Sequence, residues 1–168
     1  MRNNRTRTLP GTKIVTLNRL KTIIAGLKRA GKKIVFTNGC FDILHYGHVK
    51  YLQDARAKGD YLVVAVNSDA SVKKIKGKDR PVIGELDRMR TLAALACVDF
   101  IVLFNQSDPL EVIKNLKPDY LVKGSDWSSK NIIGADFVKE RGGKVLTVKL
   151  VSGRSTTALI KKIVKVFS

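Results

Sequence analysis

Residues 34–48 read IVFTNGCFDILHYGH, and this stretch decides the fold. A short and nearly all-apolar run leads into a polar turn that contains Gly39, and two histidines, His45 and His48, stand three residues apart where a helix is expected to begin at Gly47. A bounded apolar run of this length predicts a buried strand. The order strand, polar turn and helix is the first half of an α/β unit.

The same order recurs along the chain. Apolar runs at 61–67, 99–104, 119–124 and 144–150 predict further strands, and amphipathic stretches between them predict helices. A leading helix is expected between the N-cap Thr16 and Gly31, and Asp108 is expected to cap a helix whose first residue is Pro109. Continuous apolar strands alternating with helices are typical of a parallel sheet covered on both faces. We therefore predict an α/β fold: a doubly wound, Rossmann-like, five-stranded parallel sheet with helices on both faces.

Composition predicts one domain. The 168 residues are 44% hydrophobic, which suits the core of a single domain over residues 13–168. Residues 1–12 are basic and polar and contain Pro10 and Gly11, so we predict a flexible basic arm there. No apolar run approaches the eighteen or so residues of a membrane span, and the N-terminus lacks the apolar core of a signal peptide. We expect a cytoplasmic protein with no membrane partner.

The charge suggests a polyanionic partner. The formal net charge is +18 at pH 7, which favours a nucleotide, a nucleic acid or another acidic surface. Many of the lysines are equally compatible with solvated helix faces. Cys40 and Cys97 lack CxxC spacing, so we interpret both as reduced thiols.

Polar clusters follow the predicted strands at 37–48, 67–82, 123–127 and 152–157. In doubly wound sheets ligands bind outside the carboxyl ends of the strands, so all four clusters are expected to converge on one crevice. His45 and His48 are placed to donate hydrogen bonds to phosphate oxygens beside a helix N-terminus, which itself attracts phosphate. Neither GxGxxG nor GxxxxGK[ST] is present in the first cluster.

Other roles for the histidines stay open at this point. A metal site of Cys40, His45 and His48 would have only Asp42 as a nearby carboxylate. A hydrolase would need Cys40 activated by a histidine, with no evident orienting group. A packing role is also open, although histidine is a poor core residue.

The motifs carry a family resemblance. TNGCFDILHYGH resembles the signature of the HxGH nucleotidyltransferase superfamily, and RSTT at 154–157 resembles its second signature, ISST or ISTT, with Arg154 where the pattern has isoleucine. The resemblance covers about residues 13–163. GKDRPV at 77–82, residues 86–104, LVKGSDW at 121–127 and residues 153–163 are most similar to heptose 1-phosphate adenylyltransferases, the C-terminal half of bifunctional ADP-heptose synthases.

The resemblance implies transfer of AMP from ATP to D-glycero-β-D-manno-heptose 1-phosphate, giving ADP-heptose and pyrophosphate for lipopolysaccharide core synthesis. His45 and His48 would stabilise charge at the α-phosphate and the bridging oxygen. Mg²⁺ would accompany ATP, with phosphate and water rather than protein side chains as its ligands. These residues include no counterpart of the sugar-kinase half, so we expect a separate heptose kinase, and relatives suggest a homodimer.

The other implied site residues fall into two groups. Nucleotide contacts are expected from Thr37, Asn38, Gly39, Cys40, Phe41, Gly47, Lys123, Asp126, Trp127, Ser155, Thr156 and Thr157. Contacts to the sugar phosphate or to another phosphate are expected from Asp42, Lys76 and Arg80.

Two alternative functions are kept. One is a cytidylyltransferase of the same superfamily, acting on glycerol 3-phosphate or a similar alcohol phosphate. The other is a nucleic-acid binding module, which the net charge and the basic arm suggest, although the chain shows no aromatic-rich RNA motif or zinc finger.

Overall fold

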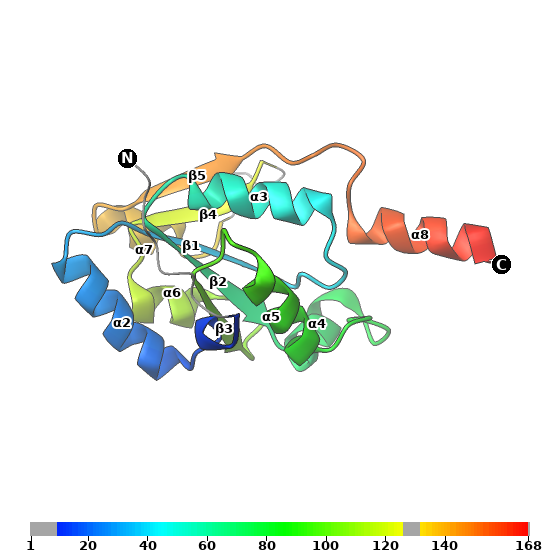
Figure 1. Ribbon diagram of the computed structural model, residues 1–168, viewed down its shortest axis with the longest axis horizontal. Coiled ribbons are helices and arrows are strands. Elements are labelled where there is room, and N and C mark those ends of the chain that lie inside the picture. The colour runs from blue at the N-terminus through cyan, green and yellow to red at the C-terminus, as the bar shows by residue number, and fades with distance from the viewer. Residues whose placement is uncertain (1–9, 126–131, 168) are drawn as a thin grey trace.

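The computed structural model describes residues 10–125 and 132–167, and Figure 1 shows helices packed around a central sheet. The elements are α1 (Pro10–Lys13), α2 (Leu17–Arg29), β1 (Ile34–Gly39), α3 (Tyr46–Arg56), β2 (Tyr61–Asn67), α4 (Asp69–Lys76), α5 (Glu85–Ala94), β3 (Phe100–Phe104), α6 (Leu110–Leu116), β4 (Tyr120–Gly124), α7 (Ala135–Glu140), β5 (Lys144–Val148) and α8 (Thr156–Phe167).

The sheet is five-stranded and parallel, with the strand order β3-β2-β1-β4-β5. Every strand pair in it is parallel, from Ile34 beside Tyr61 in β1 and β2 to Tyr120 beside Lys144 in β4 and β5. The prediction of a doubly wound, Rossmann-like sheet is confirmed. The chain reverses its direction of growth between β1 and β4, so the switch point lies at the carboxyl ends of these two strands.

Two apolar layers cover the sheet. One contains Leu20 and Ile24 of α2 with buried residues of α6 and α7, packed on strand residues such as Phe36. The other contains Leu52 of α3 and Leu92 of α5, packed on the alternate strand residues. Because successive side chains of a strand point to opposite faces, each buried strand contributes to both layers.

The structure confirms the predicted start of α2 and corrects the predicted start of α6. Thr16 caps α2, its Oγ1 accepting from the Arg19 amide at 3.4 Å, as predicted. The helix expected to begin at Pro109 begins instead at Leu110, and Pro109 is the residue before it. Asp108 still serves the helix start, since its Oδ1 accepts from the Leu110 amide at 2.9 Å.

The predicted flexible arm differs from the structure at its C-terminal end. Residues 10–12 belong to α1, which packs against α5, and residues 1–9 lie outside the described residues. The Lys13 ammonium donates to the Leu95 carbonyl at 2.9 Å, which fixes the end of α1. A buried hydrogen bond of this kind explains why a lysine is only 7% exposed here.

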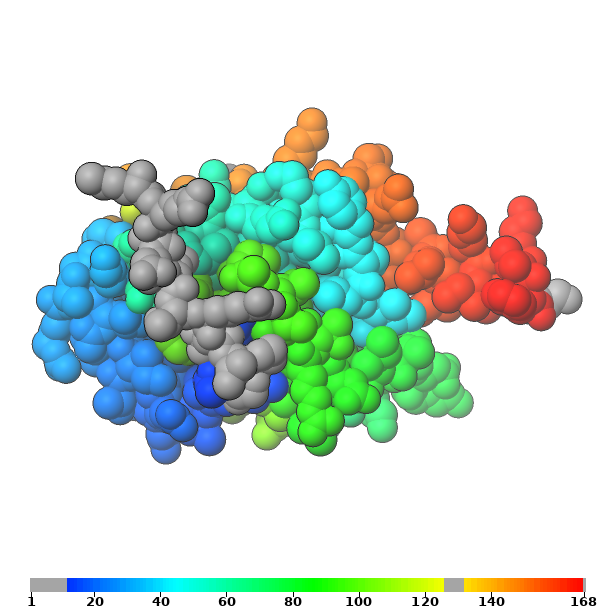
Figure 2. All heavy atoms as spheres, viewed as in Figure 1, coloured from blue at the N-terminus to red at the C-terminus, as the bar shows by residue number. Residues whose placement is uncertain are grey.

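Helix α8 differs from the other long helices because none of its residues is buried. It stands out from the body of the molecule at the C-terminal end of the chain (Figure 2). Its first two residues, Thr156 and Thr157, belong to the second motif and line the crevice, so α8 begins at the carboxyl edge of the sheet. Within residues 10–125 and 132–167, no helix has the length and apolar character that a membrane span requires.

The core predicts a stability difference between two leucines. Leu62 of β2 is fully buried, whereas Leu86 of α5 is 59% exposed. Leu62→Ala should lower the free energy of unfolding by about 2–5 kcal/mol, because the transfer free energy is lost and a cavity remains. Leu86→Ala should change it by no more than about 0.5 kcal/mol. Urea denaturation of both variants measures the difference, and equal losses would contradict this assignment of the core.

Candidate active site

A crevice of ≈ 530 Å³ lies at the carboxyl edge of the sheet, where all four polar clusters meet. The first two clusters supply Asn38, Gly39, Cys40, Phe41, Asp42, His45, Gly47, His48, Lys76 and Arg80 to its lining, and the last two supply Lys123, Ser155, Thr156 and Thr157. This convergence was predicted from the places of the clusters after the strands. It follows from the parallel topology, which brings every strand's carboxyl end to one edge.

The two motif histidines lie against each other in this crevice. Their rings are stacked, with centroids 4.0 Å apart, and the His48 ring also meets Phe41 edge-on at 5.4 Å. Both nitrogens of His45 and Nδ1 of His48 are buried, and none of them has a hydrogen-bond partner among residues 10–125 and 132–167. Because unpaired buried polar atoms are costly, these nitrogens are sites where ligand oxygens would bring stabilisation.

Gly47 allows the two motifs to approach. A Cβ atom at this position would come within 2.9 Å of His45 Cε1 and 3.1 Å of Arg154 Cβ. Any side chain at residue 47 would therefore push the imidazole or the 154–157 loop away. Thr156 adds a hydrogen bond across the same junction, with its Oγ1 3.4 Å from the Ile43 carbonyl. The first and second motifs thus form one wall.

The turn after β1 is shaped by Gly39 and Phe41. A Cβ atom at Gly39 would lie 3.1 Å from Phe41 Cε2, so the absence of a side chain makes room for the aromatic ring. Phe41 has a φ of 47°, in the left-handed region that bulky residues rarely adopt. Such conformations cost of order 1 kcal/mol and gather at functional sites. Here the turn places the Phe41 ring against His48.

Burial and neighbouring charge keep the histidines neutral in the ligand-free protein. Burial, followed by the positive charge of Arg154, lowers the pKa of His45. Burial, followed by the nearby His45, lowers the pKa of His48 to about 4. A bound polyanion would act in the opposite direction, since negative charge favours the imidazolium form. The pair is therefore able to gain protons as a phosphate ligand enters.

Cations around the crevice are held by neutral and acidic partners. Lys123, only 9% exposed, donates from Nζ to Asn38 Oδ1 at 2.5 Å, linking the ends of β4 and β1. Arg80 Nε donates to Asp42 Oδ2 at 2.5 Å. Lys76 and Arg80 of the second cluster, Lys123 of the third and Arg154 of the fourth line the crevice. Several cations around one crevice suit a ligand with several phosphate groups.

Asp42 has a role that differs from the predicted phosphate contact. Its carboxylate is buried and accepts from Arg80 and from the amides of Val82 and Ile83 at 2.8 and 3.0 Å. With both oxygens engaged, it fixes the position of the 80–83 loop. A carboxylate that also touched a phosphate would repel it, so we assign Asp42 to positioning Arg80.

Arg88 is a residue that the sequence reasoning missed. Its side chain is fully buried, and its guanidinium donates to the carbonyls of Cys40, Asn67 and Ile83 and to Asp69 Oδ1. The bonds to Ile83, Asn67 and Asp69 measure 2.9, 2.8 and 2.8 Å. One side chain therefore ties together the turns after β1 and β2 and the loop before α5.

A signal for Arg88 was present in the sequence. It falls on the apolar face of its helix with Met89 and Leu92, where an arginine must be paired if the helix packs on a sheet. The crevice lining also contains Tyr51, Asn67, Asp108 and Arg154, which were not among the predicted contacts.

Thr37 is a predicted contact that the structure does not bring to the crevice. Its side chain is fully buried, with Oγ1 2.7 Å from the Tyr51 hydroxyl, which in turn donates to the Val122 carbonyl at 3.0 Å. Thr37 is the fourth residue of β1, so its side chain falls on the face covered by α3 rather than at the strand end. Asp126 and Trp127 lie outside the described residues.

Two other roles were left open by the sequence: a hydrolase with Cys40 as its nucleophile, and a metal site of Cys40, His45 and His48. Burial is the main cause that raises the pKa of the Cys40 thiol, which makes it a poor nucleophile at neutral pH. In residues 10–125 and 132–167, no three His, Cys, Asp or Glu side chains come together as a metal-binding group. Cys40, His45 and His48 therefore do not form the metal site that the sequence left open.

The histidine pKa values predict a pH dependence of stability. His48 has a pKa of about 4 in the folded protein against 6.5 as its ordinary value, so below pH 6.5 the unfolded chain binds the proton more readily. The free energy of unfolding should therefore fall as the pH drops from 6.5 towards 4. His48→Gln should remove part of this fall, so the free energy of unfolding should decline more steeply with decreasing pH in the wild type than in the variant. Urea denaturation at several pH values tests this, and parallel profiles would contradict it.

Comparisons with known proteins agree with this geometry. The model of the cytidylyltransferase-like family matches residues 36–165. The bifunctional protein HldE of Geotalea uraniireducens is 53% identical over 151 residues, which are 90% of this chain and 31% of that protein. HldE of Geobacter metallireducens is 52% identical over 155 residues, 92% of this chain and 32% of that protein. The chain thus spans about a third of the length of these relatives.

Solved structures show the same fold. The lipopolysaccharide core biosynthesis protein of Thermoplasma volcanium has a TM-score of 0.58 and 31% identity, covering 72% of this chain and 98% of its own. Pantothenate synthetase of Thermus thermophilus, at 19% identity, has a TM-score of 0.57 and covers 83% of this chain and 62% of its own, a likeness of fold alone. The family model, the relatives at about half identity and the joined motifs lead to one conclusion: the chain belongs to the cytidylyltransferase-like family.

Proposed function

We propose that this protein transfers AMP from ATP to D-glycero-β-D-manno-heptose 1-phosphate, releasing pyrophosphate. The observation that carries the proposal is the stacked pair His45 and His48, whose unpartnered nitrogens lie in a cation-lined crevice beside the N-terminus of α3. The similarity to HldE proteins supports the choice of substrates.

The reaction suits these residues. A phosphate oxygen of the sugar phosphate forms a new bond to the α-phosphorus of ATP, and the bond from that phosphorus to the bridging oxygen breaks, leaving its electron pair on pyrophosphate. The attacking oxygen is already anionic, so no general base is needed. Catalysis then depends on alignment and on stabilising charge at the equatorial and leaving oxygens. His45 and His48, protonated when the triphosphate is bound, would donate hydrogen bonds to those oxygens.

The second motif would hold the leaving phosphates. Ser155 caps α8, its Oγ accepting from the Ala158 amide at 3.1 Å, which leaves the hydroxyl hydrogen for a phosphate oxygen. Arg154 stands beside His45 and supplies a positive charge. With the free amides at the start of α8, these groups suit the β- and γ-phosphates. Mg²⁺ would arrive with ATP as part of the substrate, bound to phosphate oxygens and water.

The wider setting belongs to the same proposal. The product would serve lipopolysaccharide core synthesis in the cytoplasm, and the sugar phosphate would come from a separate heptose kinase. A homodimer is also proposed from the family resemblance, and sedimentation equilibrium tests it.

Residues 1–12 would be dispensable for turnover.

His48→Ala tests the chemical role. The variant should lower kcat on the order of a hundredfold or more, because a donor to charge that develops in the transition state is lost. ATP affinity should change less, since the interaction is weaker in the ground state. Steady-state turnover and ATP titration measure both effects, with circular dichroism confirming the fold. Tyr46→Ala is the matched control, because Tyr46 adjoins the histidines but is 59% exposed. A near-normal kcat for His48→Ala would make the pair structural.

The choice of substrate has its own test. Turnover should require ATP and heptose 1-phosphate, and CTP with glycerol 3-phosphate should give little product. The reverse preference would identify the cytidylyltransferase alternative. For the nucleic-acid alternative, the test is a gel shift at moderate salt. We expect no retardation of DNA or RNA, whereas retardation that weakens as the salt concentration rises would support a nucleic-acid binding module.

A further inference from the structure

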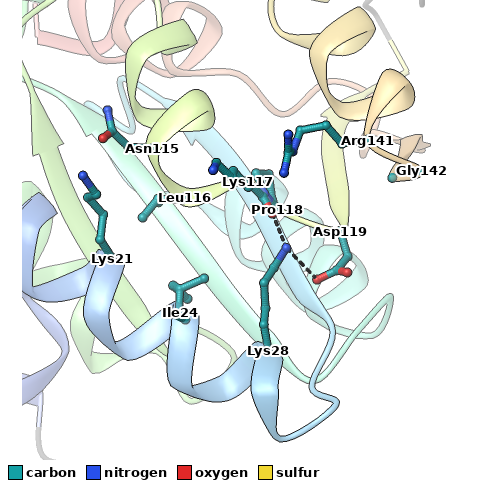
Figure 3. Close-up of a pocket in the computed structure, with 12 residues that line it drawn as sticks. Lys21, Ile24, Lys28, Asn115, Leu116, Lys117, Pro118, Asp119, Arg141 and Gly142 are labelled. Carbon is teal, nitrogen blue, oxygen red and sulfur yellow. Dashed lines mark hydrogen bonds and ion pairs between the residues drawn. The ribbon is translucent and has the colours of Figure 1, made fainter.

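A second hollow, of ≈ 390 Å³, lies at the opposite edge of the sheet from the crevice (Figure 3). It is bounded by α2 and by the turns that follow α6 and α7, where β4 and β5 begin. Four cations from these three places line it: Lys21 and Lys28 on α2, Lys117 after α6 and Arg141 after α7. Asp119 is the sole acidic residue among the described residues that line it.

The charge of Asp119 is already engaged. Its Oδ2 accepts from the Ile34 amide at 2.9 Å and lies 3.7 Å from Lys28 Nζ, while Oδ1 lies 3.6 Å from Lys33 Nζ. Lys28 also donates to the Lys117 carbonyl. One carboxylate is thus shared by two ammonium groups and a backbone amide, and it has little capacity to neutralise the remaining cations of the hollow.

The other three cations have no carboxylate partner within the part of the chain that the structure describes. Neither Lys21 nor Lys117 forms an ion pair there, and the contact recorded for the Arg141 guanidinium is the ring of Phe137, 5.7 Å away. Gathering like charges around a hollow costs electrostatic free energy, which a bound anion would recover.

The backbone adds an independent observation. Lys117 adopts φ 49° and ψ 57°, the left-handed conformation in which glycine or asparagine is usual after a helix. Lys117, which ends α6 in this conformation, lines the hollow (Figure 3). On the opposite wall Gly142 has φ 79°, and a Cβ atom there would meet nothing within 4 Å, so the space beside it is open.

Helix dipoles explain only part of this arrangement. Helices α2, α6 and α7 all end beside the hollow, and cations favour helix C-termini. That effect accounts for Lys28 in the last turn of α2 and for Lys117 and Arg141, which are the C-cap residues of α6 and α7. It does not account for Lys21, which lies in the first half of α2, two turns before Lys28, because the dipole effect falls off within the last turn.

We propose that this hollow binds an anion with two or more phosphate groups, independently of the crevice. Three cations without carboxylate partners among the described residues carry more charge than one phosphate group neutralises at neutral pH, so a diphosphate matches them better, and the volume lies within the range of small-molecule sites. The diphosphate group is the shared chemistry of two sources, free pyrophosphate and a nucleoside diphosphate. Pyrophosphate and ADP therefore form the two arms of the test.

The test is a titration of the ¹⁵N-labelled full chain, followed by amide resonances. With either ligand the amides of Gly142 and Gly143 should shift, along a saturation curve of their own, while those of Gly39 and Gly47 report the crevice. In the double variant Lys117→Gln/Arg141→Gln, the affinity seen at Gly142 and Gly143 should fall at least tenfold. The crevice shifts and the turnover with saturating substrates should stay unchanged. Tighter binding of ADP than of pyrophosphate would identify the nucleotide as the ligand.

Lys58→Gln is the charge control, because Lys58 is exposed, lies outside the hollow, and its replacement removes one of the two unit charges that the double variant removes. It should leave the Gly142 and Gly143 titration unchanged. The proposal is overturned if these amides do not respond to either ligand, or if the double variant titrates as the wild type does. It is also overturned if Lys58→Gln weakens binding as much as the double variant, since the effect would then be one of net charge. None of these results depends on the identity of the sugar phosphate.

Discussion

The buried guanidinium of Arg88 is the interaction on which the geometry of the crevice depends. It donates to the carbonyl groups of Cys40, Asn67 and Ile83, and so joins the turn after β1, the end of β2 and the loop before α5. Asp69 balances its charge at 2.8 Å. Burying a cation is costly unless it is paired and hydrogen-bonded, and the four hydrogen bonds of Arg88 favour this one arrangement of the loops over others. The crevice is therefore held in shape before a ligand arrives.

The wall of the crevice that carries His45 and His48 combines this rigid frame with buried nitrogens that lack a hydrogen-bond partner among the described residues. The imidazoles of His45 and His48 pack together where burial keeps them neutral, and Gly47 lets the second motif close against them. A site that leaves polar atoms unpaired loses stability in the free state and regains it on binding. The low pKa of His48 has the same consequence: burial disfavours the imidazolium form at neutral pH, and a bound anion would favour it.

The fold places many of the cations behind the net charge of +18 in two separate groups. Cations line the carboxyl-edge crevice, among them Lys76 at the end of α4, Arg80 in the loop after it and Lys123 near the end of β4. Another group lines the hollow at the amino edge, with Lys117 and Arg141 on its walls. The sheet separates the two groups, so each acts locally, since charges further apart than about 10 Å are largely screened at physiological salt. A sum of charges alone does not distinguish two concave sites from a uniformly basic surface.

The sequence by itself determined the parallel sheet, the place of the crevice and most of its lining. These follow from local patterns: apolar runs bounded by turns specify strands, and parallel topology carries their carboxyl ends to one edge. The hydrogen-bond partners of individual side chains could be learned only from the tertiary structure. Thr37 turned towards Tyr51 because the strand alternation fixes its face, and Asp42 was committed to the 80–83 loop. Arg88 became the link between loops, since such contacts join residues far apart in the chain and leave no local periodic signal.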